Sequence, residues 1–164
     1  MNSILGPQDG ESVEFGGLGV RFMATGEGFS LVEHPIAPRT LAAPMHVHQH
    51  EDEYSYVLEG ELGVQVGDEI AYAKPGELVF KPRGIWHAFW NRTDEPARVL
   101  EIISPAGFER YFAELKQLLE PQPDFEALAA LQARYGLEMD MASAATIAER
   151  EGLAVPGGTS TAAG

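Results

Sequence analysis

Short apolar runs alternate with turn-forming residues from about Val13 to Ser104. Runs of this kind, bounded by glycine, proline, asparagine or aspartate, are typical of β-strands. Many short strands at close spacing favour a closed or two-sheet all-β architecture. The expected strands are 20–25, 29–34, 54–58, 62–66, 70–73, 78–81, 86–90 and 97–103.

Residue types assign three of the turns between these strands. Gly67-Asp68 suits a type II′ hairpin, in which the first central residue has a positive φ. Pro75-Gly76 matches the central pair of a type II turn. Residues 82–84, Pro-Arg-Gly, fit a type I turn with proline at its second position and glycine at its fourth. This last turn introduces the strand 86–90.

The apolar spacing changes after Ser104. Between 108 and 119, aromatic residues and leucines recur at intervals of three and four, which predicts an amphipathic helix. Ser104 and Pro105 suit the N-cap and the first helical position, so we expect the helix to begin there. Two more helices are predicted at 124–135 and 143–151, each followed by a glycine that can end it.

These patterns divide the chain into three parts. We expect a β-barrel domain over 1–104, a helical extension over 105–152 and a flexible tail over 153–164. The extension would pack on the barrel or on a dimer partner. It holds nine acidic and four basic residues, which argues against a DNA-binding helix-turn-helix.

Composition and charge narrow the function classes. The 164 residues carry a formal charge of −14, from 25 acidic and 11 basic side chains, which opposes nucleic-acid binding. The sequence lacks both a membrane-length apolar run and an apparent secretion signal, so we expect a cytoplasmic protein without a membrane partner. The chain has no cysteine, so any metal site must use imidazole and carboxylate groups. Such groups suit iron, manganese, nickel, copper or zinc.

Four residues form a candidate metal-binding set. His46 and His48 lie two apart, so an extended strand places both on one face. Glu53 follows after a bend, and His87 comes much later, after the predicted turn at 82–84. Three imidazoles and one carboxylate make a mixed nitrogen and oxygen site for a borderline divalent cation.

The spacing of these residues resembles two motifs of the cupin superfamily. Residues 46–60, HVHQHEDEYSYVLEG, resemble the first: His, any residue, His, four residues, Glu, six residues, Gly. Residues 76–91, GELVFKPRGIWHAFWN, resemble the second: Gly, five residues, Pro, any residue, Gly, two residues, His, three residues, Asn. Every defining position is filled, and the short spacer 61–75 is similar to that of small single-domain, quercetin dioxygenase-like cupins.

The resemblance implies an all-β fold, a cupin barrel, which is a double-stranded β-helix or jelly roll. The C-terminal α-helical extension predicted from the apolar spacing lies outside the resemblance. It implies one divalent transition metal with His46, His48, Glu53 and His87 as ligands. It also implies that four residues are structural, namely Gly60, Pro82, Gly84 and Asn91.

Neighbouring polar residues need separate interpretations. Using His50 as a ligand would displace His46 and shorten the gap to Glu53, so we expect His50 behind the ligands or on the surface. Glu51 and Asp52 are expected to be solvated loop acids. His34, which precedes a proline, is expected at the surface at a strand end.

Side-chain parity predicts which residues face the barrel interior. Ser55, Val57 and Phe89 share parity with Glu53 or His87, and we expect them to line the cavity. Packing is their default role, and contact with substrate is the alternative. Trp86 and Trp90 have the opposite parity, so at least one should be covered by a helix or a second subunit. We therefore predict a homodimer.

The leading functional hypothesis is a mononuclear non-haem metal oxygenase, similar to quercetin dioxygenase-like cupins, acting on a small organic, aromatic substrate. Glu53 would be both a metal ligand and the proton acceptor from a substrate hydroxyl. Two alternatives are a non-redox isomerase or lyase and a non-catalytic metal- or ligand-binding cupin. One barrel hosts all of these functions, so the fold does not choose among them.

Overall fold

The computed structural model describes residues 4–154. Ten strands come first along the chain: β1 (Ser12–Phe15), β2 (Leu18–Thr25), β3 (Ser30–Ile36), β4 (Thr40–His48), β5 (Asp52–Glu59), β6 (Leu62–Val66), β7 (Glu69–Ala73), β8 (Leu78–Lys81), β9 (His87–Asn91) and β10 (Ala97–Ser104). The remaining elements are α1 (Glu109–Leu119), α2 (Phe125–Arg134), β11 (Leu137–Met139) and α3 (Ser143–Glu151).

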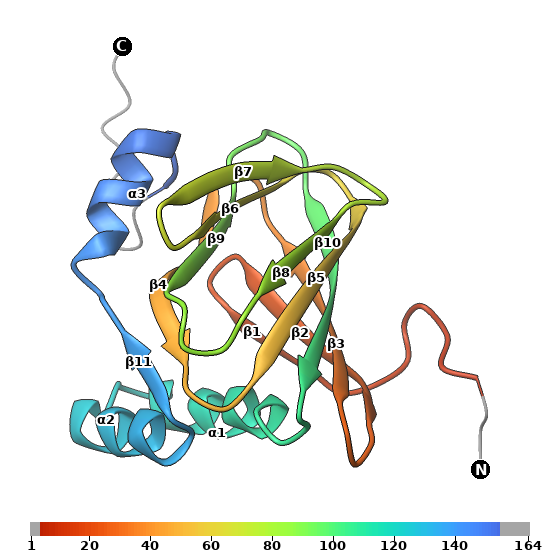
Figure 1. Cartoon of the computed structure of the whole chain (residues 1–164). Helices are drawn as coiled ribbons and strands as arrows, with labels where there is room; N and C mark the ends of the chain where they lie inside the picture. Colours follow the sequence, from red (N-terminus) through yellow and green to blue (C-terminus); the bar gives the residue numbers. More distant parts are fainter. Residues whose placement is uncertain (1–3, 155–164) are drawn as a thin grey trace.

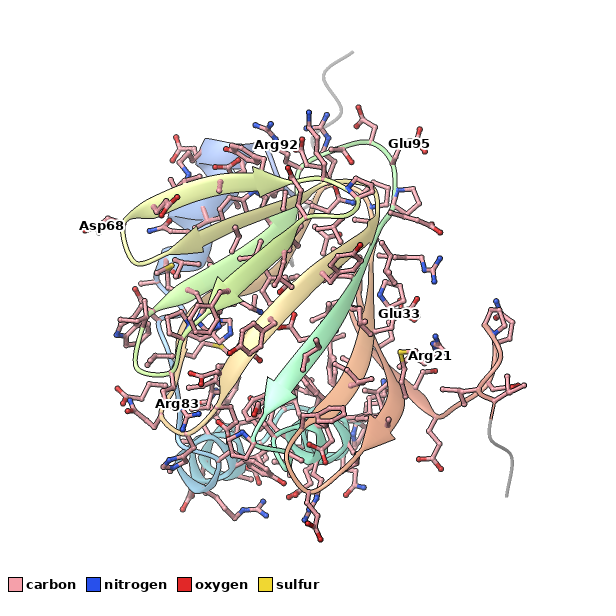
Figure 2. All side chains as sticks on the ribbon, turned by 45° about the vertical axis from the view of Figure 1, so that its right-hand side comes forward. Arg21, Glu33, Asp68, Arg83, Arg92 and Glu95 are labelled. Atoms are coloured by element: carbon pink, nitrogen blue, oxygen red, sulfur yellow. The ribbon has the colours of Figure 1, made fainter. Side chains whose placement is uncertain are left out.

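The strands form two antiparallel sheets that face each other (Figure 1). One has the order β1-β2-β3-β10-β5-β8, and the other has the order β11-β4-β9-β6-β7. Helices α1 and α2 lie at one end of the barrel, whereas α3 lies beside the five-stranded sheet. The all-β architecture with C-terminal helices is confirmed. In Figure 2, Arg83 lies toward the helical end, and Arg92 and Glu95 lie at the opposite end.

Alternation along each strand determines which side chains face the interior. In β10 every second residue is buried, beginning with Ala97. This inward row contains two aliphatic side chains, Val99 and Ile103, but between them it contains Glu101, which is 2% exposed. A carboxylate in such a row needs a charged or hydrogen-bonding partner inside the barrel.

Strand β9 is buried on both faces because α3 covers its outer side. Trp90 is fully buried and packs with Ile147 and Ala148 of α3, so the prediction that a helix covers a tryptophan is confirmed. Trp86 is 38% exposed. Gly63 on the neighbouring strand β6 is required by this packing, because a Cβ there would lie 2.1 Å from Trp90 Nε1.

Two predicted turns are confirmed and one is shifted. Gly67 and Gly76 both have positive φ, as the type II′ and type II assignments require. The turn after β8 begins one residue later than predicted. Ile85 N donates to Pro82 O, and Gly84, with a φ of 75°, occupies the third position instead of the fourth. Proline therefore opens this turn, and the left-handed glycine sets its type.

The extension differs from the prediction at its start. Ser104 is not a helix cap: it is the last residue of β10, and its hydroxyl donates to Gly28 O. Helix α1 begins only at Glu109. The predicted second and third helices are present as α2 and α3, and Asp124 caps α2 by accepting a hydrogen bond from Ala127 N.

Strand β11 was not predicted. Its three residues pair with β4 opposite His46, Val47 and His48. A three-residue strand between two helices has too few positions to show a period of two, so the sequence pattern could not reveal it. The predicted tail falls mostly outside the described residues, apart from Leu153, which is buried, and Ala154, which bridges to Thr40. Within residues 4–154, none of the helices has the length and apolar character needed to span a bilayer.

Candidate metal centre

The structure brings His46, His48, Glu53 and His87 together inside the barrel. Each offers a donor atom, these atoms lie within 4.8 Å of one another, and all four side chains are buried. The three histidines come from the paired strands β4 and β9, where His46 lies opposite His87. Glu53 comes from β5 in the other sheet. The set therefore joins the two sheets across the interior.

Hydrogen bonds to the backbone orient two of the imidazoles. His46 Nδ1 donates to Pro44 O at 2.8 Å, and His87 Nδ1 donates to Ile85 O at 3.0 Å. The Nε2 atom of each ring is then the unprotonated nitrogen in the neutral form, with its lone pair available to a cation. His87 Nε2 lies 3.2 Å from Glu53 Oε2, and His48 Nε2 lies 3.4 Å from Glu53 Oε1.

The electrostatics of the site favour neutral imidazoles and an ionised carboxylate. Burial, reinforced by the neighbouring histidines, holds the pKa of His46 well below its usual value. Burial also lowers the pKa of His48, to about 4. Burial alone would raise the pKa of Glu53, but the nearby His48 and Lys81 and the hydrogen bond with His87 more than offset it, so this pKa lies well below its usual value. These protonation states are the ones that metal binding requires.

Two buried polar atoms behind His48 support the fit to a metal ion. His48 Nδ1 and Glu51 Oε2 lie 3.8 Å apart, and neither has a hydrogen-bond partner. A metal-ligating histidine usually donates its other N–H to a carboxylate, which fixes the orientation of the ring. A small rotation would join these two atoms. The expectation that Glu51 is a solvated loop acid is wrong, because it is only 8% exposed and turned toward His48.

A cavity of about 200 Å³ opens beside this site. Helix α1 closes one end of the cavity with aromatic and leucine side chains, and Phe108 packs edge-on against His48 at 4.2 Å between ring centroids. His34, predicted at the surface, is 2% exposed and lines the cavity between Phe89 and Phe112. Its Nδ1 donates to Gly19 O, and burial lowers its pKa.

Charged residues that the motifs do not mark line the same cavity. Lys81 is 1% exposed, and its Nζ lies 3.0 Å from Glu53 Oε2 and 2.9 Å from Glu101 Oε1. Ser55 Oγ donates to the other oxygen of Glu101 at 2.7 Å. Burial alone would lower the pKa of Lys81, but the two carboxylates raise it above its usual value. The inward parity of Glu101 on a strand of apolar residues was the sequence signal that could have revealed this network.

The other residues predicted near the site lie partly in the cavity lining and partly outside it. Phe89 lines the cavity, whereas Val57 belongs to the apolar core and does not line it. Ser55 also lies outside the cavity lining and reaches it only through Glu101. His50 is exposed, as expected. Asp52 is partly exposed and pairs with Arg83.

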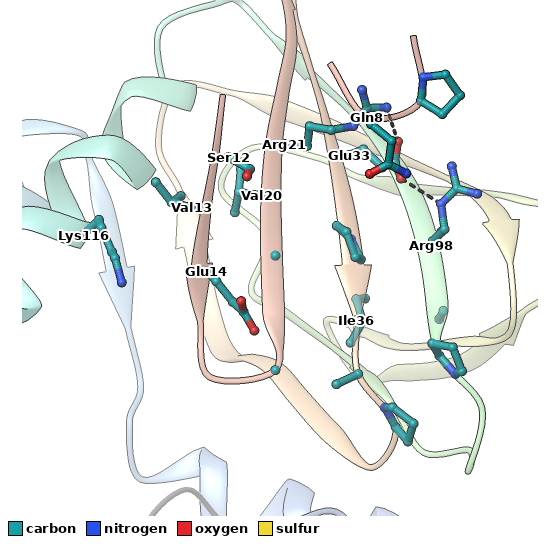
Figure 3. A pocket seen from close by; sticks show the side chains of 18 residues that line it. Gln8, Ser12, Val13, Glu14, Val20, Arg21, Glu33, Ile36, Arg98 and Lys116 are labelled. Carbon is teal, nitrogen blue, oxygen red and sulfur yellow. Dashed lines mark hydrogen bonds and ion pairs between the residues drawn. The ribbon is translucent and has the colours of Figure 1, made fainter. Parts of the chain in front are cut away.

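A larger groove of about 940 Å³ lies on the outer face of β1, β2, β3 and β10 (Figure 3). Its buried carboxylate, Glu33, is already paired with both Arg21 and Arg98. Burial alone would raise the pKa of Glu33, but the two guanidinium groups lower it below its usual value. This groove does not include the histidines, so the inner cavity is the candidate site.

Comparisons with known proteins agree with this geometry. A family model described as Cupin domain matches residues 33–103. The Tetracenomycin polyketide synthase protein TcmJ of Streptomyces glaucescens is 42% identical over 60 residues, 37% of this chain and 40% of TcmJ. Oxidoreductase iacF of Pestalotiopsis fici is 44% identical over 48 residues, 29% of this chain and 24% of iacF. The matches thus span less than half of these curated relatives.

A solved structure shares the fold. KdgF from Halomonas sp. superposes with a TM-score of 0.61 at 17% identity, over 66% of this chain and 99% of KdgF. At this identity the likeness concerns the fold alone.

Proposed function

We propose that this chain, whose residues 33–103 match the family model described as Cupin domain, is a metal-dependent enzyme of the oxygenase type that acts on a small aromatic or enolic substrate. The observation that carries the proposal is the set of four buried donor atoms within 4.8 Å of one another, beside an apolar cavity. His46, His48, Glu53 and His87 would hold one divalent transition metal. The sequence match to an oxidoreductase, iacF, adds support for redox chemistry.

A redox-active metal held there would supply Lewis acidity and electron transfer to dioxygen. The protein groups would do the remaining work. Glu53 Oε2, which faces Lys81 and His87, would accept the proton of a substrate hydroxyl. Phe89 on the barrel wall and Phe108 and Phe112 on the α1 side would hold an aromatic ring and exclude water. Each aromatic wall is set by packing, so the cavity is shaped before a substrate enters.

The direct test combines metal analysis with oxygen uptake. Protein purified without chelator should carry one transition metal per chain, and it should consume oxygen with at least one member of a panel of flavonols, catechols and β-diketones. A chain without bound metal, after incubation with iron, manganese, nickel, copper and zinc salts, would contradict the proposal. Metal without oxygen uptake would remove the oxygenase part alone.

A second candidate function is a non-redox isomerase or lyase. The match to a polyketide synthase protein, TcmJ, favours it, because polyketide chains offer acidic C–H and enol groups on which a base such as Glu53 can act without an oxidant. Substrate conversion under strictly anaerobic conditions would distinguish this function from the first. Ligand binding without conversion under either condition would indicate a non-catalytic cupin.

The homodimer also stays a proposal. Leu78 and Phe80 on the sheet-edge strand β8 and Trp86 in the following turn are exposed apolar side chains. A second copy packing on this edge would bury them. Light scattering across micromolar concentrations should show the mass of two chains, and a monomer throughout that range would contradict it.

A further inference from the structure

The charges around the cavity do not balance. Among the described residues, the formally charged side chains that line it are Glu53, Lys81 and Glu101; the histidines count as neutral, the form in which an imidazole binds a metal. Two carboxylates and one ammonium leave a formal charge of −1. A divalent cation bound by Glu53 and the histidines changes this charge to +1. In a cavity with apolar walls, an uncompensated charge is costly and attracts one counter-charge.

Lys81 is the side chain that can meet such a counter-charge. Its ammonium has three donors, and the described residues provide two partners, Glu53 Oε2 at 3.0 Å and Glu101 Oε1 at 2.9 Å. Glu101 is fixed in turn by the hydroxyl of Ser55. Lys81 Nζ also lies 4.9 Å from the centre of the Phe89 ring, on the cavity side of the sheet. A rigidly held ammonium with a spare donor therefore stands beside both the metal ligand Glu53 and an aromatic wall.

We propose that Lys81 donates a hydrogen bond to an anionic oxygen of the ligand, and that the metal-loaded cavity selects monoanionic, mainly apolar ligands. Suitable groups are an aromatic carboxylate, a phenolate or an enolate. A neutral ligand would leave the charge of +1 uncompensated, and a dianion would reverse it. This inference rests on the proposed function, because the positive charge requires the metal.

Benzoate and benzamide are suitable probes because they have nearly the same shape and differ by one charge. Calorimetric titration of the zinc-loaded wild type should give a benzoate Kd at least about tenfold lower than that of benzamide, as expected for a charge-assisted hydrogen bond. The metal-free wild type, with its charge of −1, should not bind benzoate measurably.

Three variants separate the ammonium contact from the overall charge. Lys81→Met lowers the loaded charge to zero and should weaken benzoate binding about tenfold or more. Glu101→Gln raises the loaded charge to +2 and should leave benzoate binding unchanged or tighter. The double variant K81M/E101Q keeps the wild-type charge of +1 but lacks the ammonium, so its benzoate affinity should also fall. Benzamide affinity should stay within about twofold in all three.

The double variant also serves as a test if a single variant fails to fold. Removing both partners of a buried ion pair is commonly tolerated, whereas removing one leaves an unpaired charge. Zinc content should remain one per chain in each variant that folds, because no substituted side chain is a proposed ligand.

The outcomes distinguish this inference from the proposed function. A wild type that binds none of iron, manganese, nickel, copper and zinc overturns both, since the cavity then keeps its negative charge. A zinc-loaded wild type that binds benzoate and benzamide equally overturns the charge inference alone. A double variant that binds benzoate as tightly as the wild type overturns the role of Lys81. Selective benzoate binding without oxygen uptake supports the inference while removing the oxygenase function.

Discussion

The two walls of the cavity differ in the charge of the polar side chains that they bury. The imidazole wall consists of His46 and His48 on β4 together with the neighbouring His87 on β9, and burial keeps His46 and His48 neutral. The charged wall, Glu53, Lys81 and Glu101 on β5, β8 and β10, holds full charges that neutralise one another only in part. The first wall offers neutral nitrogen donors for a metal ion, and the second offers the Lys81 ammonium for an anionic ligand.

Because of this difference, the two walls need different interactions with the residues around them. A neutral imidazole needs only one hydrogen bond to orient it, and a carbonyl of the local backbone can accept that bond, as Pro44 O does from His46. A buried ion pair needs a complete network, because a charge left alone costs several kcal/mol. The imidazole wall should therefore tolerate changes around it better than the charged wall, and changes within it should abolish metal binding.

The largest effect is expected within the imidazole wall. His46→Ala or His87→Ala removes a proposed ligand, so metal and activity should be lost together. The loss of metal affinity should exceed the 10–100-fold that is roughly typical of residues outside the ligand set. Metal content by elemental analysis after gel filtration measures it. His50→Ala is the control, since His50 is exposed, and it should keep one metal per chain. If the His50 variant alone lost its metal, the proposed ligand set would contain the wrong histidine.

Glu53, the member of the charged wall that is also a proposed ligand, should behave differently. Glu53→Gln keeps the shape and one carbonyl oxygen but removes the charge and the basicity. Turnover should fall by about a hundredfold or more, whereas the metal stays bound with reduced affinity. Steady-state kinetics of the metal-saturated variant measure its turnover, and competition with a chelator measures its metal affinity. Full turnover by this variant would remove Glu53 as the proton acceptor.

Glu51 tests whether the imidazole wall needs support from behind. Because its buried carboxylate lies 3.8 Å from His48 Nδ1, Glu51→Gln should weaken metal binding about 10–100-fold. Turnover of the metal-saturated enzyme should change little. Asp52→Asn is a matched control from the next position, since Asp52 pairs with the half-exposed Arg83. Equal metal affinity in both variants would show that His48 is oriented without Glu51.

The smallest effect concerns His34, an imidazole on the sheet of the charged wall that is not a proposed ligand. Its pKa is lowered by burial, so the folded state keeps it neutral while the unfolded chain takes up a proton below about pH 6.5. The stability that it contributes is present above that pH and is lost as the pH falls toward the folded pKa. His34→Asn keeps a donor for Gly19 O but removes this titration.

The measurement for His34 is the melting temperature of metal-free protein at about pH 8 and about pH 5.5. The wild type should lose a few degrees more than the variant between these values, roughly what a change of 1 kcal/mol produces in a chain of this size. An equal loss in both proteins would show that His34 is charged, or that its titration is not linked to folding.

The imidazole wall could be predicted from the sequence and most of the charged wall could not. His46, His48 and Glu53 lie close together in the chain, and strand periodicity gives the first two a common face. Lys81 and Glu101 are separated by 20 positions and meet only because β5 pairs with both β8 and β10. The order of the strands in the sheet brings these two residues together, and that order cannot be read from a single sequence.

The same reasoning explains the errors near the site. Glu51 and His34 were expected in solvent because loop acids and strand-end histidines are usually exposed. His34 is buried by a part of the chain far away in sequence, since it packs with Phe112 of α1. Glu51 is buried because it turns toward His48, three residues before it, instead of toward solvent. The helical extension was predicted as a set of helices, but its use as the closed end of the cavity depends on tertiary packing.

Strand β11 makes the extension inseparable from the barrel. It pairs with β4 along His46, Val47 and His48, and β4 has β9 on its other side. A fragment cut after residue 104 would leave β4, which carries two of the proposed ligands, as an open edge with unpaired amides and carbonyls, a template on which a second chain can add. For protein engineering, the smallest portable unit is therefore the barrel plus everything through Met139, and a graft of the two histidine motifs alone would carry the ligands without the strand that keeps them in register.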